Sequence, residues 1–157
     1  MLGKGGRTMD EKRLKNRLET VFPARSENEG LARAIAAAFA AQADPTIEEL
    51  TEIRTAISEA VSNAVIHAYP QGDGSVTMEL CLYEDGVMVI SVEDRGVGIE
   101  DVTRAREPLY TTGTDGERSG MGFTVMESFM DRLEVVSEPG KGTRVTMVKR
   151  LDLSYEW

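Results

Sequence analysis

The feature that most constrains the fold is a β-hairpin predicted in the middle of the chain. Residues 76–84, VTMELCLYE, alternate apolar and polar side chains with the period of a strand that buries one face. The apolar positions are Val76, Met78, Leu80 and Leu82. Asp85-Gly86 is a hairpin turn signal, and VMVISVED, residues 87–94, is predicted to be the returning strand. An antiparallel pair with one apolar face is therefore predicted over 76–94.

A strand and two helices are predicted before this hairpin. RLETVF, residues 17–22, is rich in strand formers and stops at Pro23. Each helix is preceded by a capping-box pattern, in which a hydroxyl residue is followed three positions later by Glu. The pairs are Ser26 with Glu29 and Thr46 with Glu49. The first helix is expected over about 31–43, and the second runs to Pro70.

The region after the hairpin begins with a long irregular segment. Residues 95–119 have no sustained period except a short helical turn near VTRAR, and such loops are usually functional or disordered. A helix over about 121–132, a strand over 133–138, a glycine turn and a last strand over 143–151 complete the chain. This grouping predicts an α+β two-layer sandwich, with helices on one face of a mixed, mostly antiparallel sheet.

Composition limits the class of protein. With 157 residues, 41% hydrophobic and 29% charged, the chain is the size of one globular domain. We expect a flexible tail over residues 1–12 and a single domain over 13–157. The start lacks the apolar core of a secretory signal, and no apolar run reaches membrane-spanning length, so a cytoplasmic protein is expected.

The formal charge of −9 argues against direct nucleic-acid binding, which depends on Lys and Arg contacts to phosphates. An acidic surface suits a basic protein partner, although charge that simply keeps the chain soluble is also consistent with this number.

The second predicted helix carries an unusual polar stripe. Glu59, Asn63 and His67 recur every four residues, which places them on one line of an α-helix. Apolar residues fill most of the remaining circumference: Ile57, Ala60, Val61, Ala64 and Val65. A carboxylate and a carboxamide in such a place need partners, because an unpaired buried polar group costs about 1–3 kcal/mol. The partners could be protein or ligand.

Two glycine clusters follow predicted elements. Asp94 ends a strand and is followed by Gly96 and Gly98, so a carboxylate could stand at the mouth of a pocket where the backbone bends closely. SGMGF, residues 119–123, opens a helix, whose N-terminus attracts anions, and Arg118 precedes it. A plain turn and a plain helix start explain these clusters equally well when each is taken alone. PGKGT, residues 139–143, does not have the Walker spacing.

In combination these segments resemble the GHKL ATP-binding family, which includes DNA gyrase B, Hsp90, MutL and histidine kinases. The resemblance is strongest to its anti-sigma factor serine kinases and covers about Leu18 to Leu151. EAVSNAVIHAY is similar to the N box, EDRGVGIED to the first glycine box, and EPLYTT with ERSGMGFTVMESFMD to the lid and second glycine box. His67, the one histidine, lies inside the N-box helix, which disfavours a histidine kinase; we expect it to make only a structural hydrogen bond.

The resemblance implies ATP and Mg²⁺ as cofactors and assigns roles to residues. Asn63 would be the metal ligand, Glu59 the general base, and Asp94 the acceptor for the adenine amino group. Residues about 104–119 would form the ATP lid. The remaining nucleotide contacts would be Gly96, Gly98, Thr111, Thr112, Arg118, Ser119, Gly120, Met121, Gly122 and Thr143.

The function implied by the resemblance is that of an anti-sigma factor with kinase activity. It would inhibit a sporulation sigma factor, sigma F, and phosphorylate a serine of an anti-anti-sigma factor, with the kinase acting as a homodimer. One alternative is a general-stress anti-sigma kinase of the same fold. Another is a nucleotide-gated binding module without significant catalysis, against which the retention of both Glu59 and Asn63 counts.

Overall fold

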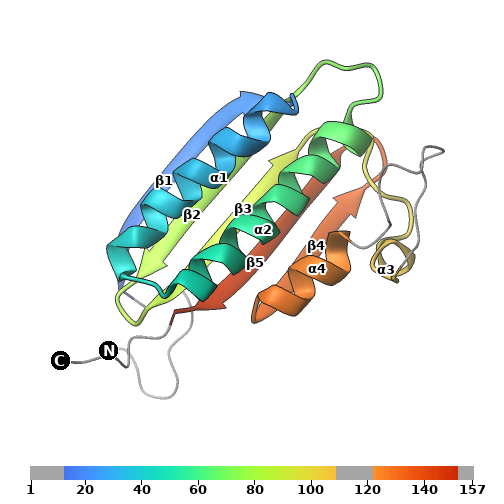
Figure 1. The fold of residues 1–157 in the computed structure, drawn as a ribbon. Helices are drawn as coiled ribbons and strands as arrows, with labels where there is room; N and C mark the ends of the chain where they lie inside the picture. The colour runs from blue at the N-terminus through green and yellow to red at the C-terminus, as the bar shows by residue number, and fades with distance from the viewer. Residues whose placement is uncertain (1–12, 109–121, 152–157) are drawn as a thin grey trace, which may run out of the picture.

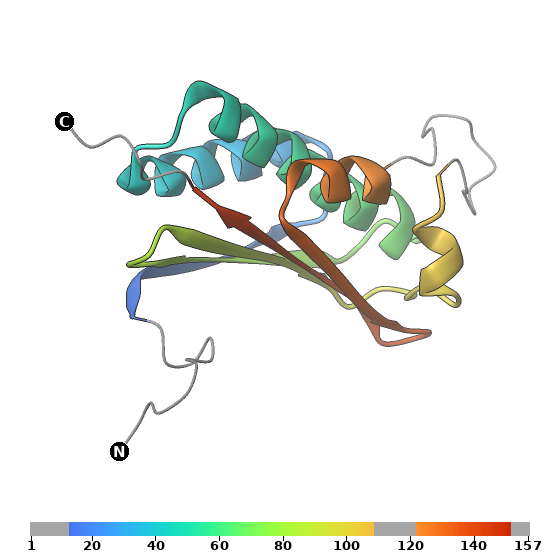
Figure 2. The same cartoon turned by 90° about the horizontal axis from the view of Figure 1, so that it is seen from below.

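The computed structural model describes residues 13–108 and 122–151 and shows one sheet covered on one face by helices (Figures 1 and 2). Within these ranges there are five strands: β1 (Leu14–Pro23), β2 (Ser75–Tyr83), β3 (Val87–Asp94), β4 (Arg132–Glu138) and β5 (Gly142–Arg150). The helices of the same ranges are α1 (Glu27–Ala40), α2 (Ile47–Asn63), α3 (Val102–Ala105) and α4 (Gly122–Phe129). A 3₁₀ turn, η2 (Ala41–Ala43), follows α1, and a π-helix, η3 (Ala64–Ala68), follows α2. The tail expected over residues 1–12 lies outside the described residues.

The sheet has the strand order β1-β2-β3-β5-β4, and every neighbouring pair in it is antiparallel. The predicted hairpin is present as β2 and β3, with Gly86 at φ +89° in the turn. Within the described residues the sheet is therefore fully antiparallel, whereas a mixed, mostly antiparallel sheet was expected. Because β5 lies beside β3, Thr143 pairs with Asp94, which the sequence separates by almost fifty residues.

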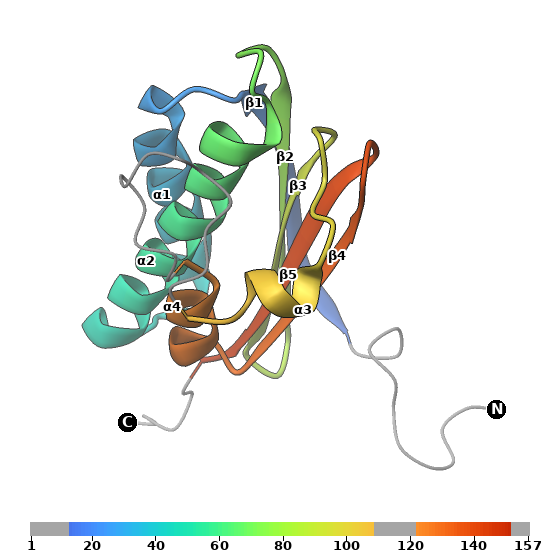
Figure 3. The same cartoon turned by 90° about the vertical axis from the view of Figure 1, so that its right-hand side faces the viewer.

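The core lies between the sheet and one layer of helices, α1, α2 and α4 (Figure 3). α2 lies between α1 and α4, and its Ile53, Ile57 and Val61 are fully buried. They pack over the inward side chains of the central strands, among them Leu80, Ile90 and Met147. Complete burial of such a side chain contributes about 1.5–3 kcal/mol. The α+β sandwich predicted from the sequence is confirmed, and no helix in the described ranges is long and apolar enough to cross a bilayer.

The two predicted capping boxes have different outcomes. Thr46 is extended at φ −70° and ψ 163°, accepts a hydrogen bond from the N–H of Glu49, and is bonded in return by the Glu49 side chain. Ser26 has helical angles of −62° and −30° and makes no side-chain cap bond. A capping side chain needs an extended backbone at its own residue, so the prediction at Ser26 is wrong.

The second predicted helix changes form before it ends. It is an α-helix to Asn63 and then a π-helix over Ala64–Ala68, so the 3.6-residue geometry holds for Glu59 and Asn63 but not for His67. Glu59 and Asn63 are the part of the predicted stripe that lies on α2, and His67 lies in the π-helix. The carbonyl oxygen of Ala68, at the end of the π-helix, accepts a hydrogen bond of 2.9 Å from the N–H of Val97.

Candidate functional site

Helices α2 and α4 lie side by side (Figure 1). The polar stripe of α2 faces the first residue of α4. A Cβ atom added to Gly122 would lie 3.2 Å from Oε1 of Glu59 and 3.4 Å from Nδ2 of Asn63. The absence of a side chain at Gly122 therefore brings the helix start into contact with both polar groups. This contact joins the predicted N box to the second glycine of the predicted second glycine box.

Glu59 and Asn63 are half-buried, and neither side chain makes a hydrogen bond or ion pair with another described residue. Their neighbours Ala60, Val61 and Ala64 are buried, so the two polar groups stand out from an apolar helix face. The side chains of Glu59 and Asn63 therefore have no protein partner within the described ranges. A carboxylate and a carboxamide left free one turn apart can serve a ligand.

The donor set suits Mg²⁺ bound together with phosphates. Among the described residues no three His, Cys, Asp or Glu side chains gather into a group that could hold a metal. Mg²⁺ usually takes one or two protein oxygens and completes its shell with phosphates and water. The carboxamide oxygen of Asn63 has the chemistry of such a ligand, and Gly122 at the start of α4 lies close beside it.

Asp94 forms a second part of the site, at the end of β3. Its carboxylate is 8% exposed and accepts a hydrogen bond of 2.9 Å from the N–H of Gly96. Burial raises the pKa of Asp94 above its ordinary value, and nearby Glu93 raises it further, while the backbone N–H groups of Gly96 and Thr143 act in the opposite direction. A solvated aspartate in a simple turn is therefore excluded.

The glycines after Asp94 are required by close backbone packing. A Cβ at Gly96 would lie 2.0 Å from the carbonyl oxygen of Ala68, and one at Gly98 would lie 2.3 Å from that of Glu138. Gly98 also has φ +78°, a conformation that side chains disfavour. The loop is thus clamped between the end of the π-helix and the β4–β5 turn, which holds Asp94 in a fixed place.

Two positioning residues were not predicted from the sequence. The hydroxyl of Tyr69 accepts from the N–H of Arg95 at 2.8 Å and donates to the carbonyl of Ser75 at 2.7 Å. Ser137 accepts from the N–H of Ile99 at 2.7 Å, and its hydroxyl lies 2.8 Å from that of Thr143. Tyr69 was visible as the end of the N-box segment, but the strand position of Ser137 carried no signal.

Part of the predicted site belongs to a segment outside the described residues. Thr111, Thr112, Arg118, Ser119, Gly120 and Met121 lie outside the described residues, as does most of the expected lid. Its first residues belong to the end of α3 and the turn after it, and Asp101 caps this helix by accepting from the N–H of Arg104. Arg106 then forms an ion pair of 3.0 Å with Glu127 of α4. This pair connects the beginning of the expected lid to the helix after it.

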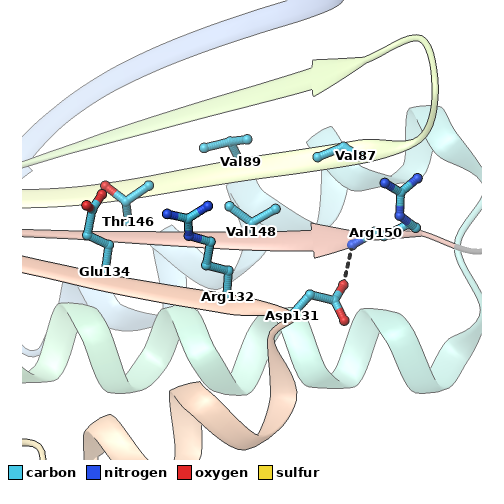
Figure 4. Close-up of a pocket in the computed structure, with 8 residues that line it drawn as sticks. All are labelled: Val87, Val89, Asp131, Arg132, Glu134, Thr146, Val148 and Arg150. Carbon is cyan, nitrogen blue, oxygen red and sulfur yellow. Dashed lines mark hydrogen bonds between the residues drawn. The ribbon is translucent and has the colours of Figure 1, made fainter. Parts of the chain in front are cut away.

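A separate hollow lies on the other face of the sheet, which none of the described helices covers (Figures 2 and 4). Its lining combines an apolar floor with charged side chains: Val87, Val89, Asp131, Arg132, Glu134, Thr146, Val148 and Arg150. None of the predicted site residues belongs to this lining. The hollow is therefore distinct from the site formed by α2, α4 and the end of β3.

Comparison with known protein families assigns this chain to one of them. Residues 22–149 match the family described as the histidine kinase-like ATPase domain. The match covers most of the chain, so the protein belongs to this family of ATPase and kinase domains. The N-box stripe, the buried aspartate and the glycine contacts all lie within the matched residues.

Within this family the chain is homologous to anti-sigma F factors. It is 55% identical over 138 residues to the anti-sigma F factor of Clostridium perfringens, covering 87% of this chain and 98% of that one. It is 51% identical over 138 residues to the anti-sigma F factor of Geobacillus kaustophilus, covering 88% of this chain and 94% of that one.

Solved structures show the same fold. The RsbU and RsbW domains of a Mycobacterium tuberculosis protein match with a TM-score of 0.63 and 22% identity, covering 87% of this chain and 33% of that one. Full-length ShkA in complex with AMPPNP matches with a TM-score of 0.55 and 19% identity, covering 84% of this chain and 31% of that one. At these identities the likeness concerns the fold alone.

Proposed function

We propose that this protein is an ATP-dependent protein serine kinase that also binds and inhibits a sigma factor, sigma F of sporulation. Its kinase substrate is an anti-anti-sigma factor, which phosphorylation inactivates. The observation that carries the proposal is the contact of Gly122 with Glu59 and Asn63, two polar side chains without partners among the described residues. The names of the homologues support the sigma-factor part.

Each side chain of the stripe has a distinct task in this proposal. Asn63 holds the metal through its carboxamide oxygen, while the N–H groups at the start of α4, for which a helix provides no intrahelical acceptors, favour phosphate. When bound, Mg-ATP supplies the phosphoryl group that is transferred. Glu59 accepts the proton of the serine hydroxyl, which makes that oxygen a better nucleophile. The half-exposed position of Glu59 allows a protein substrate to reach it.

The end of β3 recognises the base. The buried carboxylate of Asp94 is an acceptor, and the adenine amino group is a donor of matching chemistry. Gly96 and Gly98 keep the carboxylate in place through their packing against Ala68 and Glu138. Thr143, opposite Asp94 in the sheet, closes the same side of the pocket.

The charge of the chain supports a basic protein partner. A sigma factor contacts DNA phosphates and carries Lys and Arg for that purpose, whereas this chain has a formal charge of −9. Opposite charge would accelerate association and disfavour other acidic proteins. We further propose that the protein acts in the cytoplasm as a homodimer, which would present two copies of the binding surface.

The test is phosphate transfer from labelled ATP. The purified protein is incubated with [γ-³²P]ATP and candidate anti-anti-sigma proteins, and the products are examined for acid-stable phosphoserine. Phosphoserine on the candidate that vanishes with Glu59→Gln is the expected result. Sigma-factor capture that requires ATP but is accompanied by no transfer would indicate a nucleotide-gated binding module and contradict the kinase assignment.

A further inference from the structure

Lys149 is a charged residue in an apolar position. Along the face of β5 that points to the helices it follows Val145 and Met147, and it is only 8% exposed. Its ammonium group forms an ion pair with Glu52 of α2 and donates to the carbonyl oxygen of Phe129 at 2.8 Å. Burial of a charge is costly even when it is paired, and apolar residues of similar volume often stabilise a protein as well or better. The position of Lys149 therefore calls for a role other than stability.

The contacts of Lys149 join the two helices that form the site. Glu52 is on α2, and Phe129 is the last residue of α4, whose carbonyl carries the negative end of the helix dipole. At the other end of the same two helices, Glu59 of α2 lies against Gly122 of α4. The helices therefore run antiparallel, with the Lys149 contacts near the end of α4 and the approach of Glu59 near its start.

The two contacts have the same spacing on both helices. Glu52 precedes Glu59 by seven residues, and Gly122 precedes Phe129 by seven. Seven residues are about two helical turns, or roughly 10.5 Å along the axis. A contact fixed at the Glu52 end therefore sets the position of Gly122 beside Glu59. Hydrogen bonds are directional and short, whereas apolar contacts tolerate sliding, so a lysine fixes this position better than a methionine.

We propose that Lys149 is a positioning residue that fixes the axial register of α4 against α2 and so holds Gly122 beside Glu59 and Asn63. The inference rests on the proposed function, in which this contact forms the phosphate and metal side of the site. Lys149 touches neither nucleotide nor substrate and acts through the two helices. Outer residues that orient a metal site typically change affinity or activity by about 10–100-fold when they are replaced.

The test separates register from stability with the double variant Glu52→Leu, Lys149→Met, which leaves no unpaired charge. We expect urea unfolding to show a stability equal to or above that of the wild type. Mg-AMPPNP affinity, measured by calorimetry, should fall by about 10–100-fold. The nuclear Overhauser contact between the Gly122 α-proton and the Asn63 side-chain amide is expected because a Cβ placed on Gly122 would lie 3.4 Å from Nδ2 of Asn63, and in the double variant this contact should weaken in the absence of nucleotide. Lys141→Met, at a 73% exposed side chain, is the matched control and should change none of these.

A stable double variant with wild-type affinity and an intact Gly122–Asn63 contact would overturn the inference. If the wild type itself does not bind Mg-AMPPNP, the proposed function fails, while the Overhauser measurement still decides whether Lys149 sets the register. If the double variant does not fold, Glu52→Gln tests the inference instead. This substitution keeps the volume of the Glu52 side chain, which is 24% exposed, so the variant is expected to fold. A severalfold loss of affinity is then expected, and unchanged affinity refutes the role of the pair.

Discussion

Replacement of Asp94 with asparagine should reverse the hydrogen-bonding character that the end of β3 presents to a nucleobase. The carboxylate accepts from the N–H of Gly96 at 2.9 Å, and the oxygen of the new carboxamide can keep that bond. Its NH₂ group then occupies the place of the other oxygen and carries only donors. The shape of the side chain is almost unchanged, so the effect isolates hydrogen bonding from packing.

The expected magnitude follows from the burial of Asp94, which is 8% exposed. A hydrogen bond to a charged group contributes about 1.5–3 kcal/mol, and about 1.4 kcal/mol is a tenfold change in affinity. ATP affinity should therefore fall by roughly 10–100-fold. Inosine triphosphate has a carbonyl where ATP has the amino group, so the variant should bind it at least as well as the wild type does.

Calorimetry with the Mg²⁺ complexes of ATP and inosine triphosphate measures both effects. The ratio of the two affinities should shift toward inosine triphosphate by at least tenfold in Asp94→Asn. The ratio serves as its own control, because a general loss of folding would weaken both ligands together. ATP affinity and a ratio that both stay at the wild-type values would refute the assignment of Asp94 to the base.

The same substitution has a consequence for stability against pH. Burial holds the pKa of Asp94 above its ordinary value, so between that value, about 3.9, and the raised one the folded state binds more protons than the unfolded state. The contribution of Asp94 to the free energy of unfolding therefore falls as pH rises through this interval. The asparagine side chain does not titrate, so the free energy of unfolding of Asp94→Asn does not contain this decrease. Relative to the wild type, the stability of the variant should therefore increase with pH in this interval. Urea unfolding across pH 4 to 7 checks the sign, and a relative decrease would contradict it.

Three further substitutions test the rest of the site. Asn63→Ala should make ATP binding insensitive to Mg²⁺, and a wild-type response to EDTA in calorimetry would exclude Asn63 as the ligand. Glu59→Gln should keep ATP affinity and lower phosphoryl transfer by about 10²–10⁴-fold, whereas near-normal turnover excludes it as the base. Gly96→Ala should lower the free energy of urea unfolding by about 1–3 kcal/mol, because its Cβ would lie 2.0 Å from the Ala68 oxygen. Gly30→Ala, inside α1 with no atom closer than 3.5 Å, is the matched control and should raise it by about 0.5–1 kcal/mol.

The strands and most helices could be predicted because their signals are local. The strand expected over 87–94 is observed as β3 (Val87–Asp94), bounded by the Asp85-Gly86 turn and the glycine loop. At Ser26 a local pattern was misleading. Hydrogen bonds from Arg25 to Pro23, Asn28 to Arg25 and Glu29 to Ser26 form successive turns that give Ser26 a helical backbone. The turn that follows β1 therefore fixes the backbone of Ser26 in a conformation that prevents its side chain from capping the helix.

The sequence by itself determined the residue types of the site and the one-turn spacing of Glu59 and Asn63, since the period of an α-helix depends only on neighbouring residues. Only the tertiary structure decided that Gly122 lies against this pair, that Asp94 is buried opposite Thr143, and that Lys149 points inward between two helices. These contacts join segments that are distant in the chain, and they exist because the apolar faces of the helices and the sheet can be buried only against one another.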